Sequence, residues 1–407
     1  IFSLDLSAMN LMEKIEDYVH SAPKCYRCDS IVELIPSKQW FVKMEDLAKL
    51  AIAPIKSGKI KFHPKRWEKV YLNWLRNTRD WCISRQIWWG HQFPVFFCVK
   101  KLEKIKNDDE NFIVSVKKPK QCPFCGSCEM KQSENVFDTW FSSALWPFAV
   151  LGWPASTNDL KKFYPTDVLI TARDIINLWV ARMVYSGSAL AKKIPFKNVI
   201  INATVVTKDG QRMSKSLGTG VDPLELVEKY GADALRFGLI YQNLGSQDIK
   251  FGEEAILTGK KFCNKIWNAS RFVIQNLNSK IPAFAEVSTG KQNSKYQTKA
   301  DKKILLGIKK LRKDTEASIE KYEFGTALHR LYDFFWHQYA DIYIETAKKQ
   351  MAEEILKTNT QKILLKVHTD LLKLLHPFLP FVTEEIWGIL GKLGNSKNLM
   401  ITEKWPQ

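Results

Sequence analysis

Residues 198–231 read NVIINATVVTKDGQRMSKSLGTGVDPLELVEKYG, which joins a β-branched run, a polar loop and a helix-like run. The first of these, residues 198–206, favours a strand that leads into Asp209-Gly210, a strong turn signal. Asp222 followed by Pro223 is typical of a helix start, with an aspartate N-cap and a proline in the first helical position. This order of elements predicts a strand–loop–helix unit of an α/β domain.

The loop at residues 209–220 carries groups that suit a bound phosphate. Lys215 and Arg212 supply positive charge of the kind that phosphoryl oxygens need, and Ser214 and Ser216 add hydroxyl donors. Its glycines allow the backbone to approach a ligand closely. Taken alone, the same residues also fit a solvated basic turn, so the neighbouring sequence has to separate the two interpretations.

The α/β pattern extends upstream of the loop and is replaced by helical spacing downstream. Val168-Leu169-Ile170 is a short buried-strand pattern, and an apolar helical stretch follows from Ile175 to Tyr185. A polar stretch at 278–301 interrupts the later helices. Apolar residues recur at helical spacing on both sides of it, at Phe262, Ile266, Val273, Leu277, Ile304, Ile308, Leu311, Leu328, Leu331, Phe335, Ile363, Val367, Leu371 and Leu375. We therefore expect an α/β domain followed by a helical bundle.

Composition narrows the class of partner. The 407 residues permit two or three domains, and 45% of them are hydrophobic. No long uncharged apolar run is present, so we expect a soluble chain without a membrane partner. A net charge of +18 suits a polyanion such as a nucleic acid, although a generally lysine-rich composition would produce the same excess.

Four of the eight cysteines form two CxxC pairs, Cys25/Cys28 and Cys122/Cys125. Four thiolates are enough for one closed tetrahedral Zn²⁺ site, and the absence of secretory features favours metal binding over disulfides. Gly126 permits a tight turn after the second pair. Cys128 is a competing ligand, and thiols without a metal are the alternative.

The segments around the loop carry a family resemblance. RMSKS at 212–216 resembles the KMSKS signature of class I aminoacyl-tRNA synthetases, with Arg212 in place of the first lysine. Four further segments resemble the valine, isoleucine and leucine group of these enzymes: DWCISRQIWWGHQFPVFFC (80–98), VFDTWFSSALWPFAVLGWP (136–154), VLITARDIINLWVARM (168–183) and LLHPFLPFVTEEIW (374–387). The second and third of these look most like the valyl-tRNA synthetases. The family's other nucleotide signature, a HIGH-type His-x-Gly-His, is not in the sequence.

The resemblance implies an α/β plus all-α fold, the second half of a Rossmann-like class I synthetase catalytic domain followed by a helical-bundle anticodon-binding domain. Residues 1–40 would be the exit of an editing insertion with a first zinc knuckle. Residues 41–255 would be the catalytic part, with a second knuckle near 122–128 and the loop 212–216. Residues 256–407 would bind the anticodon.

The implied activity is that of a valine–tRNA ligase, which activates valine with ATP and Mg²⁺ and transfers it to tRNA(Val) in the cytoplasm. As a partial enzyme, the chain would be inactive alone, and no stable protein partner is expected. The alternatives are a stand-alone tRNA-binding module that contains zinc but has no catalysis, and a fragment of an isoleucyl-tRNA synthetase.

The resemblance also assigns residue roles. Lys215, with Ser214, Ser216 and Arg212, would stabilise the α-phosphate and the leaving pyrophosphate, and Asp174 would accept hydrogen bonds from the ribose of ATP. Met213 would touch adenine or fill an apolar gap. Three residues would wall the valine side chain or pack as ordinary core, namely Trp140, Ile175 and Trp179. Four aromatic residues would stack anticodon bases or pack inside the bundle, namely Trp336, His337, Tyr339 and Tyr343.

Overall fold

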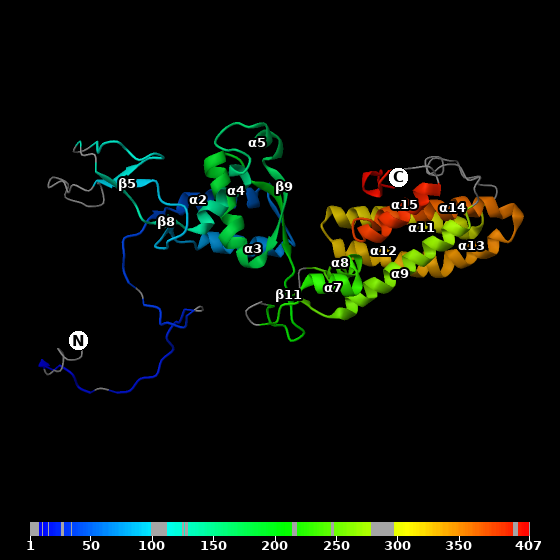
Figure 1. The fold of residues 1–407 in the computed structure, drawn as a ribbon, viewed down its shortest axis with the longest axis horizontal. Coiled ribbons are helices and arrows are strands. Elements are labelled where there is room, and N and C mark those ends of the chain that lie inside the picture. Colours follow the sequence, from blue (N-terminus) through cyan, green and yellow to red (C-terminus); the bar gives the residue numbers. More distant parts are fainter. Residues whose placement is uncertain are drawn as a thin grey trace. The chain divides into compact units, whose positions relative to one another are not determined.

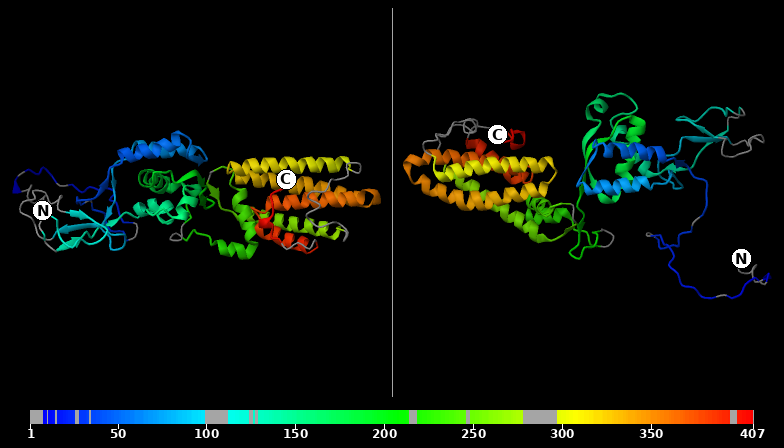
Figure 2. Two further views of the ribbon diagram at one scale, coloured as in Figure 1. Left: turned by 90° about the horizontal axis from the view of Figure 1, so that it is seen from above. Right: turned by 180° about the vertical axis from the view of Figure 1, so that it is seen from behind.

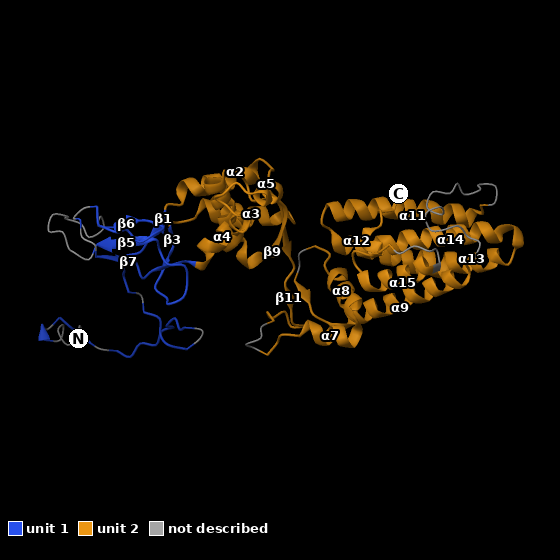
Figure 3. Cartoon of the chain, turned by 45° about the horizontal axis from the view of Figure 1, so that its top comes forward, with its two compact units in different colours: residues 1–42, 81–138 blue, residues 43–80, 139–407 orange. Residues whose placement is uncertain are grey.

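A computed structural model describes most of the chain as two compact units, residues 1–42 with 81–138 and residues 43–80 with 139–407 (Figure 3). The described residues are 8–9, 11–14, 16–25, 28–33, 35–98, 112–123, 126, 129–213, 218–245, 248–277, 297–393 and 398–406. No helix within these ranges is both long and apolar enough to cross a membrane.

The first unit is built from short antiparallel strands. A central strand, β5 (Val95–Cys98), pairs with β6 (Phe112–Val114) and β7 (Met130–Gln132). Two further pairs are β1 (Phe41–Val42) with β3 (Trp81–Cys82), and β4 (Ser84–Arg85) with β8 (Val136–Phe137). The small core of the three-stranded sheet holds Phe96, Cys98, Cys122 and Met130. Such a core orders a compact insertion rather than a large domain.

The second unit contains a three-stranded parallel sheet in the order β2–β10–β9. Its strands are β2 (Lys61–His63), β10 (Phe196–Asn202) and β9 (Thr166–Ala172). The register aligns Ile200 with His63 on one side and with Ile170 on the other. Helices α2 (Glu45–Lys56), α3 (Arg66–Arg76), α4 (Thr139–Ala149) and α6 (Ala181–Ser186) belong to the same region, together with the short α5 (Asn158–Phe163) (Figure 1).

One face of this sheet is covered. Phe62, Val199 and Ile201 are at most 3% exposed. Tyr71 of α3 packs on Phe62, with 5.3 Å between the ring centroids, and its hydroxyl donates to the carbonyl of Ala51 in α2. This covered face therefore forms a helix-on-sheet core.

The opposite face corrects an expectation drawn from the sequence. The run Val168-Leu169-Ile170 does form strand β9, but Val168 is 38% exposed and Ile170 is 56% exposed. Alternate residues of a strand point to opposite faces, so these two side chains share a face that the described residues leave partly exposed at β9. A continuous apolar run predicts burial on both faces, which holds only when helices cover both.

The expected helix from Ile175 to Tyr185 is present in a modified form. A 3₁₀ turn, η2 (Arg173–Ile175), leads into a π-helical segment, η3 (Ile176–Val180), and then into α6. A second π-helical segment, η4 (Gly187–Ala191), follows. Apolar spacing reports which side of a helix is buried, but it does not report the local winding, and π turns often lie at functional positions.

The loop region is bounded by regular elements. Strand β11 (Val205–Val206) pairs in parallel with β12 (Ile249–Lys250), and α7 (Pro223–Tyr230) is followed by α8 (Ala232–Tyr241). The predicted start of α7 is confirmed, because the Asp222 carboxylate accepts the backbone N–H of Leu224 at 2.8 Å and Pro223 occupies the first turn.

The helical half has its own large core, and its long helices run side by side in both views of Figure 2. Its elements are α9 (Glu253–Gln275), α11 (Lys299–Glu320), α12 (Phe324–Asp333), the π-helical η6 (Phe334–Tyr343), α13 (Ile344–Met351), α14 (Glu354–Leu375), α15 (Pro380–Leu393) and the 3₁₀ turn η7 (Met400–Thr402). The bundle that was expected from helical spacing is present.

Two of the four aromatics considered for base stacking belong to this core. Tyr339 is fully buried and Tyr343 is 2% exposed. The Tyr339 hydroxyl lies 3.0 Å from Nδ1 of His368, whose Nε2 lies 2.9 Å from the Ser270 hydroxyl. Of the two roles left open by the sequence, the structure shows packing inside the bundle for both tyrosines and excludes base stacking, because neither ring face is open to a base. Trp336 packs against the core, and His337 is exposed.

Candidate functional site

The carboxyl end of strand β9 places Asp174 at the edge of the parallel sheet. The strand ends at Ala172, and the 3₁₀ turn that follows presents the Asp174 carboxylate with half of its side chain exposed. Open parallel sheets bind ligands just beyond the carboxyl ends of their strands. The carboxylate is therefore an accessible acceptor at the position where a ligand of this fold is expected.

Arg212 from the loop reaches this carboxylate. Its Nη1 lies 3.5 Å from Oδ2 of Asp174, although the two residues are 38 positions apart in the sequence. The arginine side chain is 78% exposed, so the pair contributes little to stability. The ion pair matters because of its location: it places Arg212, the first residue of the RMSKS loop, beside the carboxyl end of strand β9.

A tight turn explains how the chain aims Arg212. The N–H of Gly210 donates to the carbonyl of Thr207, and Gly210 has φ of 83°, a conformation that favours glycine. The N–H of Thr207 then donates to the carbonyl of Gln211, and Val206 forms a bridge with Arg212. The predicted Asp209-Gly210 turn is thus confirmed.

The rest of the signature loop is only partly visible. Met213 is half-buried. Ser214, Lys215 and Ser216 lie outside the described residues. Their roles therefore stay predictions.

Arg173 is a site residue that the sequence did not identify. Its guanidinium binds Asp248 in a two-pronged contact, Nη1 to Oδ1 at 2.9 Å and Nη2 to Oδ2 at 3.1 Å, and its Nε lies 3.9 Å from Asp174. Arg173 thus ties the end of β9 to the residue just before β12. A partner 75 positions away leaves no local signal.

The three predicted pocket residues come from adjoining elements. Trp140 lies in α4, Ile175 ends η2, and Trp179 lies in η3; all three side chains are half-buried. The Trp179 indole N–H donates to the carbonyl of Ser143 at 3.1 Å, which holds η3 against α4. Half-buried rings that are held in place can line a small apolar site, but they can equally be the margin of a core.

A buried carboxylate that sequence inspection missed directly precedes α4. Asp138 is 5% exposed and accepts two hydrogen bonds, from the Trp81 indole at 3.0 Å and from the Arg85 guanidinium at 2.7 Å. These contacts join the segments 80–98 and 136–154, which the sequence had marked separately. An acid between Phe137 and a helix rich in aromatic residues gives no local sign of such a role.

The two CxxC segments have matching backbone turns in the first unit. The N–H of Asp29 donates to the Cys25 carbonyl at 2.9 Å, and the N–H of Gly126 donates to the Cys122 carbonyl at 2.9 Å. Asp29 and Gly126 are both left-handed, with φ of 55° and 69°. Hydrogen bonding with Ser30 lowers the pKa of the exposed Cys28 thiol.

A complete four-cysteine site is not visible. Cys125 lies outside the described residues, and among those that are described no three His, Cys, Asp or Glu side chains are grouped as metal ligands would be.

Two contacts attach the bundle to α8. The Asp233 carboxylate accepts the N–H groups of Phe381 and Val382 in the first turn of α15, at 3.3 and 2.7 Å. Arg236 donates to the carbonyls of Pro377 and Phe378, at 2.8 and 3.2 Å. The segments that begin near Gly231 and at Leu374 therefore meet through two charged side chains. Asp233 accepts N–H groups at the start of α15, and Arg236 donates to carbonyls of the turn between α14 and α15.

Comparison with known proteins places these features in a family. Residues 24–252 match the tRNA synthetases class I (I, L, M and V), and residues 301–407 match the anticodon-binding domain of tRNA ligase. Valine–tRNA ligases of Clostridium tetani and Thermotoga maritima are each 46% identical to the chain over 99% of its length. The chain spans 44% of the length of these two curated relatives.

Solved structures agree on the fold. Methionyl-tRNA synthetase of Mycobacterium tuberculosis, in complex with methionyl-adenylate, superposes with a TM-score of 0.68 at 17% identity and covers 92% of this chain and 67% of its own. The LeuRS of Agrobacterium radiobacter K84 gives a TM-score of 0.62 at 18% identity and covers 81% of this chain and 42% of its own.

Proposed function

Because the chain belongs to the class I tRNA synthetase family of the isoleucine, leucine, methionine and valine enzymes, we propose that it is part of a valine–tRNA ligase. Identity of 46% with valine–tRNA ligases over nearly the whole chain supports valine as the amino acid. The complete enzyme joins valine to ATP, releases pyrophosphate, and transfers the valyl group to the terminal adenosine of tRNA(Val).

The contact between Arg212 and Asp174 is the observation that carries this proposal. In the first reaction a valine carboxylate oxygen attacks the α-phosphorus of ATP, a new oxygen–phosphorus bond forms, and the bond to the pyrophosphate oxygen breaks. Negative charge grows on the oxygens around the α-phosphorus, so fixed positive charge lowers the barrier. Arg212 and Lys215 supply that charge, Ser214 and Ser216 donate hydrogen bonds, and Mg²⁺ accompanies the ATP.

Asp174 and Met213 bind the rest of the nucleotide in this proposal. The exposed carboxylate of Asp174 accepts hydrogen bonds from the ribose hydroxyls, which suits an acid just beyond a parallel strand. Met213 offers its thioether to the adenine ring. Because Arg212 already lies 3.5 Å from Asp174, nucleotide binding exchanges this ion pair for contacts with ribose and phosphate.

Valine selection is assigned to Trp140, Ile175 and Trp179. Their half-buried positions and the hydrogen bond from Trp179 to α4 support a rigid apolar wall. A wall of this kind selects mainly by size. It therefore rejects threonine poorly, because threonine has nearly the same size as valine; this pair is a standard example of such limited selectivity.

Zinc is assigned a structural role. The matched turns after Cys25 and Cys122 orient backbone groups as a pair of CxxC knuckles requires, and thiolates are preferred Zn²⁺ ligands. Cys25, Cys28, Cys122 and Cys125 would complete a closed site, and a lowered pKa at Cys28 favours its thiolate. When bound, the metal stabilises the fold of the first unit.

The tRNA partner is supported by charge and by the anticodon-binding match. The net charge of +18 favours association with RNA, and residues 301–407 match a domain whose description names anticodon binding. Binding through phosphates should weaken steeply as salt increases.

A chimaera tests the function. The matched segment of the Clostridium tetani relative is replaced by this chain, and exchange of pyrophosphate into ATP is measured with valine or isoleucine. Valine-dependent exchange is expected, with a loss of about 100-fold or more in Lys215→Ala. Lys208→Ala is the matched control, since Lys208 lies near the same turn and is an exposed side chain that contacts Glu254.

Three results would contradict the proposal. Isoleucine-dependent exchange would move the chain to the isoleucine enzymes. Undiminished exchange in Lys215→Ala would remove that residue from catalysis. Salt-sensitive tRNA binding by a chimaera that never exchanges pyrophosphate would favour a binding module without catalysis.

A further inference from the structure

The chain that leads into the RMSKS loop continues beyond the parallel sheet as a separate pair of strands. Strand β10 ends at Asn202, which lies beside Ala172 of β9, and residues 203–204 join it to β11. Strand β11 pairs with β12 in a two-stranded ribbon of its own. A ribbon that is joined to a sheet by one short connection can turn about that connection unless a second contact holds it. The position of the loop therefore depends on how the ribbon is attached to the sheet.

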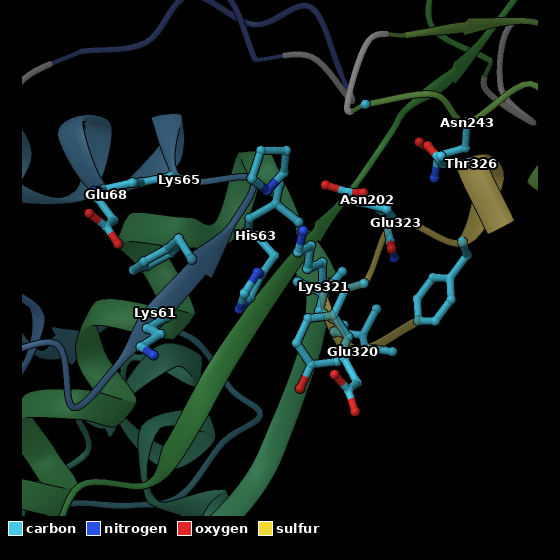
Figure 4. A pocket seen from close by; sticks show the side chains of 18 of the residues that line it. Lys61, His63, Lys65, Glu68, Asn202, Asn243, Glu320, Lys321, Glu323 and Thr326 are labelled. Carbon is cyan, nitrogen blue, oxygen red and sulfur yellow. The ribbon is translucent and has the colours of Figure 1, made fainter. Parts of the chain in front are cut away.

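The segment that approaches the ribbon from α8 borders a hollow of about 1020 Å³ (Figure 4). Asn243 lines the hollow from this segment, and Asn202 lines it from the end of β10. Ile170 and Ile200 line it from the open, partly exposed face of the sheet. Side chains that border a hollow lack packed neighbours on that side to fix their position. Particular polar contacts therefore have to hold the ribbon in place there.

A two-pronged ion pair supplies such a contact. Arg173 follows the end of β9, and Asp248 directly precedes β12. The two nitrogen–oxygen distances between their side chains are 2.9 and 3.1 Å. Two parallel hydrogen bonds from a planar guanidinium fix direction as well as distance. Both side chains are 37% exposed, so the pair orients the ribbon while adding little to the free energy of unfolding.

From Asp248 the contacts lead back to the sheet through Arg212. Strand β12 begins directly after Asp248 and pairs in parallel with β11. Val206 of β11 forms a bridge with Arg212. Arg212 in turn reaches the carboxylate of Asp174, which follows Arg173 in the chain. The path closes on itself, so a displacement of Asp248 would displace Arg212 relative to Asp174.

The two ion pairs at this end of the sheet differ in geometry. Arg212 and Asp174 make one contact at 3.5 Å, and the arginine is 78% exposed. Arg173 and Asp248 make two shorter contacts with most of each side chain out of water. A single exposed contact is exchanged easily for a ligand, whereas a two-pronged contact keeps its geometry. The second pair therefore suits a fixed support, and the first suits groups that meet a substrate.

We propose that Arg173 is a positioning residue that acts through Asp248. It fixes the ribbon of β11 and β12 and so sets Arg212 beside Asp174. This role rests on the proposed function, in which Arg212 meets the phosphates of ATP. Charge lowers a barrier only when it is held in place beforehand, and a misplacement of about 1 Å can cost about 100-fold in rate. Arg173 and Asp248 would contribute to the reaction without touching the substrate.

The position of the ribbon can be measured in this chain without the reaction. Spin labels carried on unnatural amino acids replace Lys162 of α5 and Lys250 of β12, two exposed residues of the same unit. Pulsed electron paramagnetic resonance then measures the distance between the labels, and the parent chain should give one narrow distribution. Arg173→Gln and Asp248→Asn should each broaden it by about two-fold or more, because the ribbon then turns about its connection to β10.

The effect on the reaction is measured in the chimaera with the Clostridium tetani relative. Asp248→Asn should lower kcat for valine-dependent pyrophosphate exchange by about ten-fold and leave the KM for valine within about two-fold, because the ribbon carries no residue of the valine pocket. In a chimaera that already carries Arg212→Ala, the same substitution should cost about two-fold or less, because the group that it positions is gone.

Asp167→Asn is the matched control for both measurements. Asp167 lies on β9, is 78% exposed, and pairs with Lys197 of β10 at 2.7 Å. Its substitution removes an exposed ion pair from the same sheet but leaves the ribbon attached. The distance distribution and kcat should therefore match those of the parent.

Two results would overturn the proposal. The first is an unchanged distance distribution in Arg173→Gln and Asp248→Asn. The second is a loss of exchange in Asp248→Asn that persists in full beside Arg212→Ala, since Asp248 would then act by another route. If the unmodified chimaera exchanges no pyrophosphate, the proposed function fails, and the distance measurement still decides whether Arg173 and Asp248 hold the ribbon.

Discussion

The helical bundle and the parallel sheet lie in the same unit, yet they differ in how completely they bury their apolar residues. The bundle encloses a core in which Phe335, Leu331 and Leu371 are fully buried. The sheet buries Val199 and Ile201 on one face and leaves Ile170 of the other face 56% exposed. Antiparallel neighbouring helices close a core from one continuous stretch of chain, whereas a parallel sheet needs layers on both faces. Among the described residues, the bundle therefore buries its apolar side chains more completely than the sheet does.

Truncation of a bundle core residue should have the largest effect on stability. Phe335→Ala should lower the free energy of unfolding by about 3–5 kcal/mol, because it removes buried surface and leaves a cavity. This change is measured by unfolding the chain in urea while monitoring hydrogen exchange at the backbone amides of the bundle. Phe381→Ala is the control, since that ring is 64% exposed and should change the value by about 0.5 kcal/mol or less. A small effect of Phe335→Ala would show that the bundle is loosely packed.

Acid should weaken the bundle through His368. Burial lowers the pKa of this histidine from 6.5 to about 3. Below pH 6.5 the His368 ring is protonated in the unfolded chain, whereas in the folded chain it stays neutral down to about pH 3. The free energy of unfolding therefore decreases as the pH falls from 6.5 to about 3. The loss should approach about 1.4 kcal/mol per pH unit.

The histidine contribution is measured by urea unfolding at several pH values from 7 to 4. His368→Gln removes the titrating ring while keeping hydrogen-bonding groups near Tyr339 and Ser270. The stability advantage of the unmodified chain over this variant should shrink as the pH falls. A pH-independent difference between the two would mean that His368 is not held neutral.

The junction of the two regions should show an intermediate effect. Asp233→Ala leaves two N–H groups at the start of α15 without an acceptor and should cost about 1–2 kcal/mol. Asp222→Ala is the matched control, because Asp222 caps α7 at an exposed position through one N–H group. Hydrogen exchange at residues 380–386 should rise in the first variant alone. Equal hydrogen exchange at residues 380–386 in the two variants would show that Asp233 does not stabilise the start of α15.

The smallest effect is expected on the open face. Ile170→Ala should change the free energy of unfolding of this chain by about 0.5 kcal/mol or less, because over half of the side chain is already in water. Val199→Ala, on the covered face of the next strand, should cost about 1–3 kcal/mol. Thermal and urea unfolding of the two variants compare the faces directly. Equal losses would contradict the difference between them.

Local signals in the sequence predicted local structure well. Gly210 takes the backbone conformation that its turn requires, and Asp222 with Pro223 begins α7. These features depend on interactions within a few residues, which any sequence window contains. The alternation of strand and helix and the later helical spacing also predicted the order of the α/β region and the bundle.

Features that depend on distant partners were not predicted. The sequence left base stacking and packing inside the bundle open for Tyr339 and Tyr343, because spacing alone cannot tell an inward aromatic from an outward one when both sides of the helix are apolar. The structure buries both rings. The pairing of Arg173 with Asp248, and of Asp233 with the start of α15, joins residues 75 and up to 149 positions apart. No local pattern contains both members of such a pair.

The sequence by itself determined which reactive groups the chain carries: the basic hydroxyl-rich loop, the acid after a strand, the tryptophans and the CxxC pairs. Covalent identity and short-range backbone preference are sufficient for that. The tertiary structure alone decided that Arg212 meets Asp174 and that Ile170 faces an open hollow. The physical reason is that burial and charge pairing belong to the surroundings that folding creates, and those surroundings come from segments far apart in the chain.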